Sequence, residues 1–492
     1  MSQSLFIGID IGTSSIKVVA VDFAGEVLAV SNTPISLNVP FAGWCEQNPE
    51  DWWSATCASI RQALVNIDTP EIFGIGLSGQ MHSLVALDVN HQVLRPSILW
   101  NDVRTKTEAD SIIEIVGEDA LRRFTGNPSL EGFTATKLMW MRSHEPALFD
   151  RLKHVLMPKD YIRLRLTGQI ASDPSDASGT LLFDVANNRW SSEILSSLAF
   201  DPELFPNIFE SSEIVGSVTS KASIETGLKE GIPVVTGGAD NAMAALSAGV
   251  YTSGSLLISL GTSGTVVAPI RSATSDPETR IHLMRHAIPE TWYLMGVVLS
   301  AGAALDWWRR SSGRVKFDQL ILEADLTEAG SEGVTFLPYL TGERTPHADA
   351  NARGVFFGIH SGIERPHMTR AVMEGVTFAL NDSLGLIKNL DVNISEATVV
   401  GGGANSFIWL QMLSDVMNLP LRTLTPNDGA PLGGAMLASV GTGVYDNVSD
   451  VFAAWTNDSS VVSPDVSKRQ PYDDAYARYR SLYPALRGIF SA

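Results

Sequence analysis

Cysteine is scarce in this chain, and positive charge is outnumbered by negative charge. Only Cys45 and Cys57 occur among 492 residues, which leaves neither a disulfide framework nor a cysteine-rich metal site. Lysine and arginine total 35 against 54 aspartate and glutamate residues, and the net charge of −19 argues against nucleic acid or an anionic membrane as a partner. No apolar run reaches membrane-spanning length, and the first residues lack the basic and then apolar order of a signal peptide. We therefore expect a cytosolic protein that binds neither nucleic acid nor a membrane.

The remaining composition is typical of a globular protein. Hydrophobic residues make up 45% of the chain and charged residues 18%. A chain of 492 residues exceeds what one hydrophobic core supports, so we expect two to four domains.

Residues 6–22 form the stretch around which the rest of the chain is organised. An apolar run leads into Asp10, the small residues Gly12, Thr13 and Ser14 follow, and a second β-rich run ends at Asp22. This pattern predicts two antiparallel strands joined by a tight turn. Backbone N–H groups and hydroxyls at such a turn suit a phosphate, and Asp10 suits Mg²⁺ held through its water shell. An edge hairpin in which the aspartate only supports the turn is the alternative.

The same pattern returns half a chain later, at residues 256–267. Placing Gly12-Thr13-Ser14 on Gly261-Thr262-Ser263 puts Ile9 on Ile258 and Val18 on Val267. The repeat predicts a duplicated unit, and two facing turns would grip a polyphosphate between them. Asp10 falls on Ser259, which implies one metal position rather than two. Chance similarity of two Gly-Thr-Ser turns is the alternative.

Polar residues follow several predicted strands. Gln80, Met81 and His82 come after the small-residue strand 73–77, where either a site rim or a structural histidine is expected. Asn101 follows another apolar run and lies either at a site or at the cap of the next helix. The polar stretch 172–180 is either the border of a ligand or a solvated loop.

Two glycine-rich turns complete the set of candidate sites. Asp240 and Asn241 follow Gly237-Gly238 where a helix begins, so the aspartate either caps that helix or serves as a general base for a hydroxyl. At the second turn a β-branched strand enters three glycines before an amphipathic helix, and backbone exposed in this way suits an adenine or a ribose. Its candidate residues are Gly402, Gly403, Ala404 and Asn405.

Two long segments resemble the signatures of the FGGY carbohydrate kinases, a family within the actin, hexokinase and Hsp70-type ATPase superfamily. One is Gly-Phe-Thr-Ala-Thr-Lys-Leu-Met-Trp-Met-Arg-Ser-His at 132–144, where Ser143 replaces a usually polar or charged residue. The other runs from Gly354 to Glu374 without departure. The likeness extends from Phe6 to Tyr483, and its motifs fall in the family's order.

The resemblance implies an α/β fold of two ribonuclease H-like domains of the actin/hexokinase type, with a catalytic cleft between them. We expect residues 1–246 to form an N-terminal domain that binds the sugar and carries a helical insertion at about 103–230. Residues 247–492 would form the nucleotide-binding domain, and its terminal helix, from about Pro464, would pack back on the body.

Within the family, the segment 80–82 and several others are similar to those of the xylulose kinases. The resemblance therefore implies ATP-dependent phosphorylation of the ketopentose D-xylulose to its 5-phosphate in pentose catabolism, with ATP and Mg²⁺ as cofactors. A kinase of another pentulose or of a polyol is the alternative. A sugar-sensing regulator or chaperone-type ATPase is disfavoured, because the sequence shows no peptide-binding or DNA-binding module. A homodimer is left open.

The resemblance also assigns roles to individual residues. Asp240 is the proton acceptor and Asp10 the acid near Mg²⁺. Lys17 stands seven residues after Asp10, the spacing that actin uses for a phosphate-contacting lysine, and a strand lysine without that task is the alternative. The residues expected at the sugar are Met81, His82, Asn241, Gln80, Trp44 and Asn101.

Overall fold

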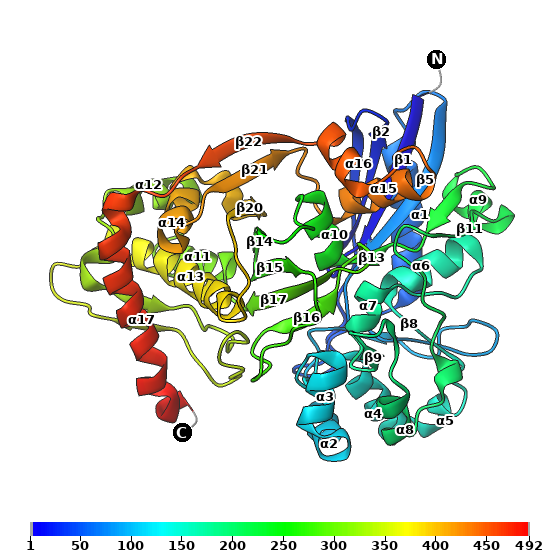
Figure 1. The fold of residues 1–492 in the computed structure, drawn as a ribbon, viewed down its shortest axis with the longest axis horizontal. Helices are drawn as coiled ribbons and strands as arrows, with labels where there is room; N and C mark the ends of the chain where they lie inside the picture. The colour runs from blue at the N-terminus through cyan, green and yellow to red at the C-terminus, as the bar shows by residue number, and fades with distance from the viewer. Residues whose placement is uncertain (1–2, 491–492) are drawn as a thin grey trace.

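Two seven-stranded mixed sheets form the framework of the molecule, as shown by a computed structural model that describes residues 3–490 (Figure 1). The strands of the first sheet, in spatial order, are β11 (Ile214–Ser217), β12 (Pro233–Val235), β5 (Pro70–Gly79), β1 (Gln3–Ile11), β2 (Ser15–Asp22) and β3 (Val27–Pro34), with β13 (Gly238–Ala239) paired to β5. Those of the second are β16 (His282–Arg285), β17 (Trp292–Val298), β15 (Gly264–Ile270), β14 (Ser255–Leu260), β20 (Glu396–Val400), β21 (Leu421–Thr425) and β22 (Asn457–Val462).

The two sheets share one topology, which confirms the predicted α/β fold and the duplicated hairpin. In each sheet an antiparallel hairpin continues into a third antiparallel strand on one side and into two parallel strands on the other. The register of the predicted repeat is wrong by one residue after the turn. Val18 pairs with Ile9, but Ile258 pairs with Val266, so Val266 and not Val267 is the counterpart of Val18. The second turn is one residue shorter than the first.

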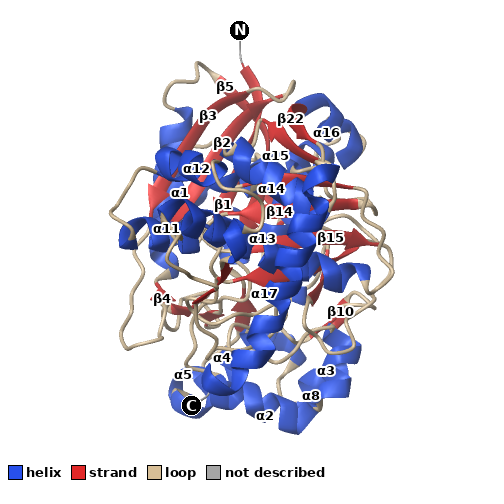
Figure 2. Ribbon diagram, turned by 90° about the vertical axis from the view of Figure 1, so that its left-hand side faces the viewer, coloured by secondary structure: helices blue, strands red, loops and turns tan. Residues whose placement is uncertain are grey.

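Helices cover the strands of both sheets (Figure 2). The long helices, each of eight residues or more, are α1 (Pro49–Leu64), α2 (Lys106–Val116), α3 (Glu118–Thr125), α4 (Thr134–His144), α6 (Pro158–Thr167), α10 (Asp240–Ser247), α11 (Gly302–Ser311), α12 (Phe317–Asp325), α13 (Arg365–Lys388), α14 (Phe407–Met417), α15 (Ala430–Gly441), α16 (Val448–Trp455) and α17 (Arg469–Phe490). The short ones are α5 (Pro146–Phe149), α7 (Pro174–Ser178), α8 (Ser192–Ser197) and α9 (Ser220–Thr226). No helix within residues 3–490 combines the length and the hydropathy needed to cross a bilayer.

Four two-residue or three-residue strand pairs lie outside the two sheets. They are β4 (Glu46–Gln47) with β7 (Ser97–Ile98), β6 (Val85–Leu87) with β8 (His154–Leu156), β9 (Phe183–Asp184) with β10 (Arg189–Trp190), and β18 (Thr335–Leu337) with β19 (Val355–Phe357). Between β7 and β11 the described chain is mainly helical, in line with the insertion expected at about 103–230.

Strand β1 is buried on both faces, and its alternation explains where Asp10 lies. Leu5, Ile7 and Ile9 belong to the apolar cluster that contains the tryptophans of α1. Phe6 and Gly8 point the other way, and the Cα of Gly8 lies so close to α15 that a Cβ would stand 1.7 Å from the carbonyl oxygen of Pro431. Asp10 continues this second face by the period of two, at the strand's carboxyl end.

The C-terminal part of the chain returns to both sheets. Helix α17 packs back on the body through Tyr472, Tyr479 and Leu482, as predicted. Helices α15 and α16, by contrast, lie against the first sheet. There the Trp455 ring lies tilted against Phe6, with 6.0 Å between the ring centroids, and its Nε1 donates a hydrogen bond to the carbonyl of Phe23. Along the chain, the first sheet has its last strand at Gly238–Ala239 and the second sheet its first at Ser255–Leu260, but α15 and α16 belong spatially with the first sheet. The domain boundary at 246/247 stays a prediction.

Candidate active site

Asp10 and Asp240 lie near one another at the carboxyl end of the first sheet. Ser78, the counterpart of Asp10 on the parallel neighbour β5, donates a hydrogen bond to Asp10 Oδ1 at 2.8 Å. Strand β13 pairs with β5 at Ser78 and Gly79 and leads directly into Asp240, the first residue of α10. The two carboxylates interact electrostatically, and the charge of Asp10 contributes to the raised pKa of Asp240.

Burial and the neighbouring acid raise the pKa of Asp240 to about 7. Asn241 opposes this shift, because its backbone N–H and its side-chain amide both donate to Asp240 Oδ1, at 2.7 and 3.0 Å. Burial also raises the pKa of Asp10, while the hydrogen bond from Ser78 and the charge of Lys17 lower it. The N-cap of α10 is Ala239, so Asp240 is the first helical residue, and its carboxylate accepts the first-turn N–H of Asn241. The role of Asp240 as a general base stays a prediction.

Met81 lies beside this acid pair through Asn241, and His82 follows Met81 in the chain. The Met81 sulfur is 3.9 Å from both the Asn241 amide nitrogen and the Tyr293 hydroxyl. His82 has a left-handed backbone (φ 67°), and Lys137 Nζ fixes its carbonyl at 2.7 Å. His82 Nδ1 lies 2.6 Å from the carbonyl oxygen of Gly179, which can only accept, so Nδ1 carries the proton and Nε2 is an acceptor.

Burial lowers the pKa of His82 to about 3, and the charges of Lys137 and Arg344 act in the same direction. The imidazole is therefore neutral at any physiological pH. A neutral ring with its proton on Nδ1 offers one acceptor to a hydroxyl group. The sequence pattern did not indicate Lys137, Tyr293 or Arg344 as neighbours of this site, since each comes from a distant segment.

The other residues predicted at the sugar lie in different surroundings. Gln80 is buried and accepts a hydrogen bond from Thr13 Oγ1 at 3.0 Å, so it ties this segment to the first turn. Trp44 packs against the Arg104 guanidinium, 3.6 Å from the ring centroid, and against Trp140. Asn101 Oδ1 is buried and has no hydrogen-bond partner among residues 3–490. Helix α2 begins only after Thr105, so the alternative of a cap at Asn101 is wrong.

A separate cavity of about 970 Å³ lies in the second unit. Its polar floor comes from the second turn and from the turn after β20, through Gly261, Thr262, Gly402, Gly403 and Asn405. Ser263 does not line it. Ala404 does not line it either, because its side chain is buried in the core. Gly403 is obligatory here, since a Cβ would stand 2.2 Å from the Leu260 side chain. The volume is that of a pocket for a drug-sized ligand.

The walls of this cavity come from helix residues that the sequence pattern did not mark as ligand contacts. They are apolar or charged side chains of α11, α12 and α14: Leu305, Asp306, Arg310, Phe317, Asp318, Ile321, Leu322, Phe407, Ile408 and Trp409. The amide of Gly302 donates to the carbonyl of Gly261, so α11 begins at the second turn. Helical periodicity alone does not distinguish residues that line a ligand site from residues that pack in the core.

The first turn lies outside this cavity. Lys17, paired opposite Asp10 in the hairpin, places Nζ 3.0 Å from both the carboxylate and the carbonyl oxygen of Asp428, just before α15. Gly12 and Ser14 remain in the tight turn, and Thr13 also accepts a hydrogen bond from Trp100 Nε1 at 2.9 Å. The predicted phosphate contacts of Gly12, Thr13, Ser14 and Lys17 stay predictions.

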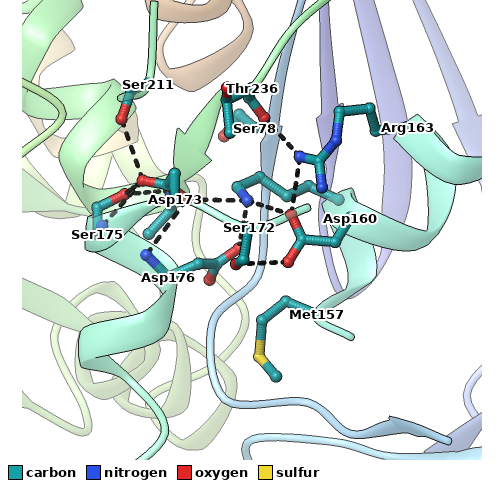
Figure 3. Close-up of polar contacts among 12 residues, drawn as sticks. Ser78, Met157, Asp160, Arg163, Ser172, Asp173, Ser175, Asp176, Ser211 and Thr236 are labelled. Carbon is teal, nitrogen blue, oxygen red and sulfur yellow. Dashed lines mark hydrogen bonds and ion pairs between the residues drawn. The ribbon is translucent and has the colours of Figure 1, made fainter. Parts of the chain in front are cut away.

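The polar stretch 172–180 is buried throughout, so the alternative of a solvated loop is wrong. Its aspartates pair with Lys159, a fully buried lysine of α6 (Figure 3). Residues 3–490 contain no group of three or more histidine, cysteine, aspartate or glutamate side chains arranged to hold a metal ion.

Comparison with known proteins identifies the family. The model of the N-terminal domain of the FGGY family of carbohydrate kinases matches residues 5–247, and that of the C-terminal domain matches residues 256–442. A xylulose kinase from Bacillus subtilis is 37% identical over 489 residues, which cover 99% of this chain and 98% of the relative. One from Escherichia coli is 38% identical over 483 residues, covering 98% and 99%.

Solved structures agree with these relatives. The crystal structure of a xyloylose kinase from Brucella ovis superposes with a TM-score of 0.92 at 38% identity, and the match covers 99% of this chain and 100% of that one. Both family models and relatives matched over their full length lead to one conclusion: the chain belongs to the FGGY family of carbohydrate kinases and is an enzyme that phosphorylates a sugar.

Proposed function

We propose that this kinase transfers the γ-phosphoryl group of ATP to the 5-hydroxyl of D-xylulose, with Asp240 as the general base. The kinase family implies ATP as donor and a sugar as acceptor. The specific sugar is supported by the full-length relatives that are named xylulose kinases. The observation that carries the mechanism is the pair of Asp240 and Asp10 beside Met81 and His82.

Asp240 accepts the proton of the attacking hydroxyl. A sugar hydroxyl is hardly ionised at neutral pH, and a base works best when its pKa lies near the operating pH. The value of about 7 for Asp240 meets that condition. The two hydrogen bonds from Asn241 hold Oδ1, which leaves Oδ2 for the substrate proton.

The sugar is oriented by acceptors and by one apolar contact. His82 Nε2 accepts from one hydroxyl, because the neutral ring has no second proton to give. The unpartnered Asn101 Oδ1 accepts from another, and Met81 with Asn241 lines the side next to the base. Gln80 and Trp44 support this surface through Thr13 and Arg104.

The nucleotide occupies the 970 Å³ cavity, with the adenine between the apolar walls of α12 and α14. Gly261, Thr262, Gly402, Gly403 and Asn405 supply the flat backbone and turn amides along it, while Ser263 and Ala404 belong to the same two turns without lining the cavity. Gly12, Thr13, Ser14 and Lys17 complete the phosphate site from the first unit. Such catalysis is mostly positioning and electrostatics.

The donor set near Asp10 fits Mg²⁺. Two neighbouring carboxylates, Asp10 and Asp240, raise the free energy of one another's charged forms, and a divalent cation beside Asp10 relieves that repulsion. Mg²⁺ is usually held by one or two carboxylates together with water and substrate phosphates, which matches a single acid at Asp10. When bound, the ion offsets charge on the β and γ phosphates. A homodimer and a cytosolic location stay predictions.

Coupled ADP release with Mg-ATP tests the function. The panel contains D-xylulose, D-ribulose, L-ribulose, glycerol and xylitol, together with a blank without sugar. We expect D-xylulose to have the highest kcat/KM over a low blank. Faster turnover of another sugar would keep the kinase and overturn the proposed substrate.

Asp240→Ala tests the base. We expect kcat to fall by about 10²–10⁴-fold, the usual cost of removing a general base, with ATP affinity retained because Asp240 lies outside the nucleotide cavity. Asp22→Asn is the control, since Asp22 accepts the turn amides of Ala24 and Glu26 after β2 and has no place in the proposed site. Wild-type turnover in Asp240→Ala would refute the assignment.

A further inference from the structure

We propose that Ser175 is a positioning residue for Asp240, and that it acts through a buried ion network which holds the segment before Asp240 at both ends. The inference rests on the proposed function, because Ser175 has this task only if Asp240 removes the proton. The network occupies α6 and α7, inside the first unit (Figure 3).

The centre of the network is a lysine without any exposure. Lys159 Nζ lies 2.5 Å from Asp160 Oδ1, 2.9 Å from Asp173 Oδ1 and 3.2 Å from Asp176 Oδ2. Arg163 adds a second cation, 2.9 Å from Asp160 Oδ1. Each of these side chains is at most 1% exposed.

Burying five ionisable side chains is a poor way to stabilise a fold, since well-packed apolar groups serve as well or better. The presence of this network is therefore better explained by the backbone segment that it holds in place. Two hydrogen bonds leave it toward one short segment. Arg163 Nη1 donates to the carbonyl of Thr236 at 2.8 Å, and Ser175 Oγ accepts from the backbone N–H of Ala239 at 2.9 Å.

The segment held in this way has no side chains of its own to fix it. Gly237 and Gly238 lie between the two attachment points, and Gly237 has φ 78°, which glycine adopts without strain. Glycine also carries the largest conformational freedom, so the outside contacts decide where the segment stays. Asp240 follows Ala239 directly, so the position of the Ala239 peptide determines where the Asp240 carboxylate lies.

Ser175 is the link between the ion network and this peptide. Its hydroxyl donates to Asp173 Oδ2 while it accepts from Ala239, so the buried aspartate fixes the direction of the hydroxyl. A Cβ at Gly238 would stand 3.0 Å from Ser175 Oγ, which shows how closely the hydroxyl lies against the segment. Loss of the hydroxyl leaves a buried N–H without an acceptor, and the segment must shift to satisfy it.

Ser175→Ala tests the role, with Ser178→Ala as the matched control. Ser178 lies on the same helix, is equally buried and also bonds backbone groups, but it faces Pro174 and Arg285 rather than Ala239. We expect Ser175→Ala to lower kcat by about 10- to 100-fold, since displacement of a catalytic group by about 1 Å costs up to 10²-fold. The KM values for sugar and ATP should stay within about twofold, as Ser175 contacts neither site.

The pH profile gives a readout that a purely structural change would not move. A loosened segment admits water to Asp240, so the acid limb of the kcat profile should shift to lower pH in Ser175→Ala and not in Ser178→Ala. If Ser175→Ala does not fold, Ser175→Cys keeps the shape of the side chain and replaces the hydroxyl by a larger and weaker acceptor, with the same expected direction.

A double-mutant cycle separates this inference from the proposed function. We expect Ser175→Ala to cause no further loss in the residual activity of Asp240→Ala, because the residue that it positions is gone. An equal loss in both backgrounds would overturn the positioning role, and so would equal kcat values for Ser175→Ala and Ser178→Ala. Full turnover of Asp240→Ala would instead overturn the proposed function, whatever Ser175 does.

Discussion

At the scale of residues, burial acts on Asp240 and His82 in opposite chemical directions. It raises the pKa of the carboxyl to about 7 and lowers the pKa of the imidazole to about 3, because it disfavours the charged form of each. Asp240 therefore titrates near neutral pH, and His82 stays neutral. The proposed base and the proposed hydroxyl acceptor therefore titrate in separate pH ranges.

The pH dependence of turnover follows from this pair. We expect kcat/KM to fall about tenfold per pH unit below pH 7 as Asp240 becomes protonated, with no second inflection from His82 above about pH 4. Initial rates with D-xylulose between pH 5 and 9 measure this. A profile that stays flat down to pH 5 would contradict the assignment of Asp240 as the titrating base.

Glu343 gives a prediction for stability. Burial raises its pKa to about 8 from an ordinary value of 4.5. Its Oε1 accepts the amides of Leu299 and Arg344, while Oε2 is buried without a hydrogen bond among residues 3–490. Its protonated form is favoured in the folded chain, so the stability that it contributes is fully present below pH 4.5 and is lost as pH rises to about 8.

Glu343→Gln keeps the accepting oxygen and removes the titration. Relative to the wild type, we expect the variant to gain about 2–3 kcal/mol of unfolding free energy between pH 6 and pH 8, at about 1.4 kcal/mol per pH unit. Thermal unfolding of both proteins across this range measures the difference. Parallel pH dependence of the two melting temperatures would show that Glu343 is ionised in the folded chain at pH 6.

Residue-scale prediction from the sequence singles out residues at or just after the carboxyl ends of strands. Asp10 lies near the end of β1, Met81 and His82 follow β5, and Asp240 follows β13, while the roles proposed for these residues stay predictions. The sequence around Ser175 and Glu343 does not indicate their roles. The surroundings of Ser175 depend on the ion pair of Asp173 with Lys159, and those of Glu343 depend on Leu299, just after β17.

At the scale of elements, the period-two pattern and the glycine turns predict both hairpins. They do not reveal the one-residue difference between the turns, because an ungapped alignment of Gly-Thr-Ser hides it. Nor do they reveal that α15 covers β1 and β5. Glycines at alternate positions of these strands, Gly8 on β1 and Gly74 and Gly76 on β5, are a local trace of that contact.

Gly76→Ala tests this close approach. A Cβ at Gly76 would stand 1.8 Å from the carbonyl oxygen of Gly434, so the strand and α15 must separate. We expect a loss of about 1–3 kcal/mol of stability from overpacking. Gly385→Ala, inside α13 with nothing within 4 Å of its Cβ position, should instead stabilise by about 0.5–1 kcal/mol. Denaturant unfolding compares the two, and equal effects would contradict the packing argument.

At the scale of the whole molecule, contacts between the two units surround the proposed reaction centre. Lys17 of the first hairpin pairs with Asp428 before α15, and Asn127 of the helical insertion donates to the carbonyl of Leu283 on β16. Gly132 faces the Arg344 guanidinium: a Cβ added at Gly132 would stand 3.9 Å from Arg344 Nη2. A sugar bound between these groups would be enclosed from both sides.

Because the bound sugar would be enclosed, we expect sugar binding to control the rate at which water hydrolyses ATP in this site. We expect ATP hydrolysis without sugar to be at least about tenfold slower than with 5-deoxy-D-xylulose, which fills the site but has no hydroxyl to phosphorylate. ADP release measures both rates. Equal rates with and without the analogue would show that the sugar does not promote closure.

The return of α15 and α16 to the first sheet also has a consequence for synthesis. Strands β1 and β5 leave the ribosome early, but the helix that covers their glycine face begins only at Ala430. At a translation rate of about 5–20 residues per second, α15 is synthesised about 20–70 s after β5, and the glycine face stays uncovered during this time. The nascent chain therefore carries an uncovered sheet face for most of its translation, and the first unit completes its core only when nearly the whole chain has been made.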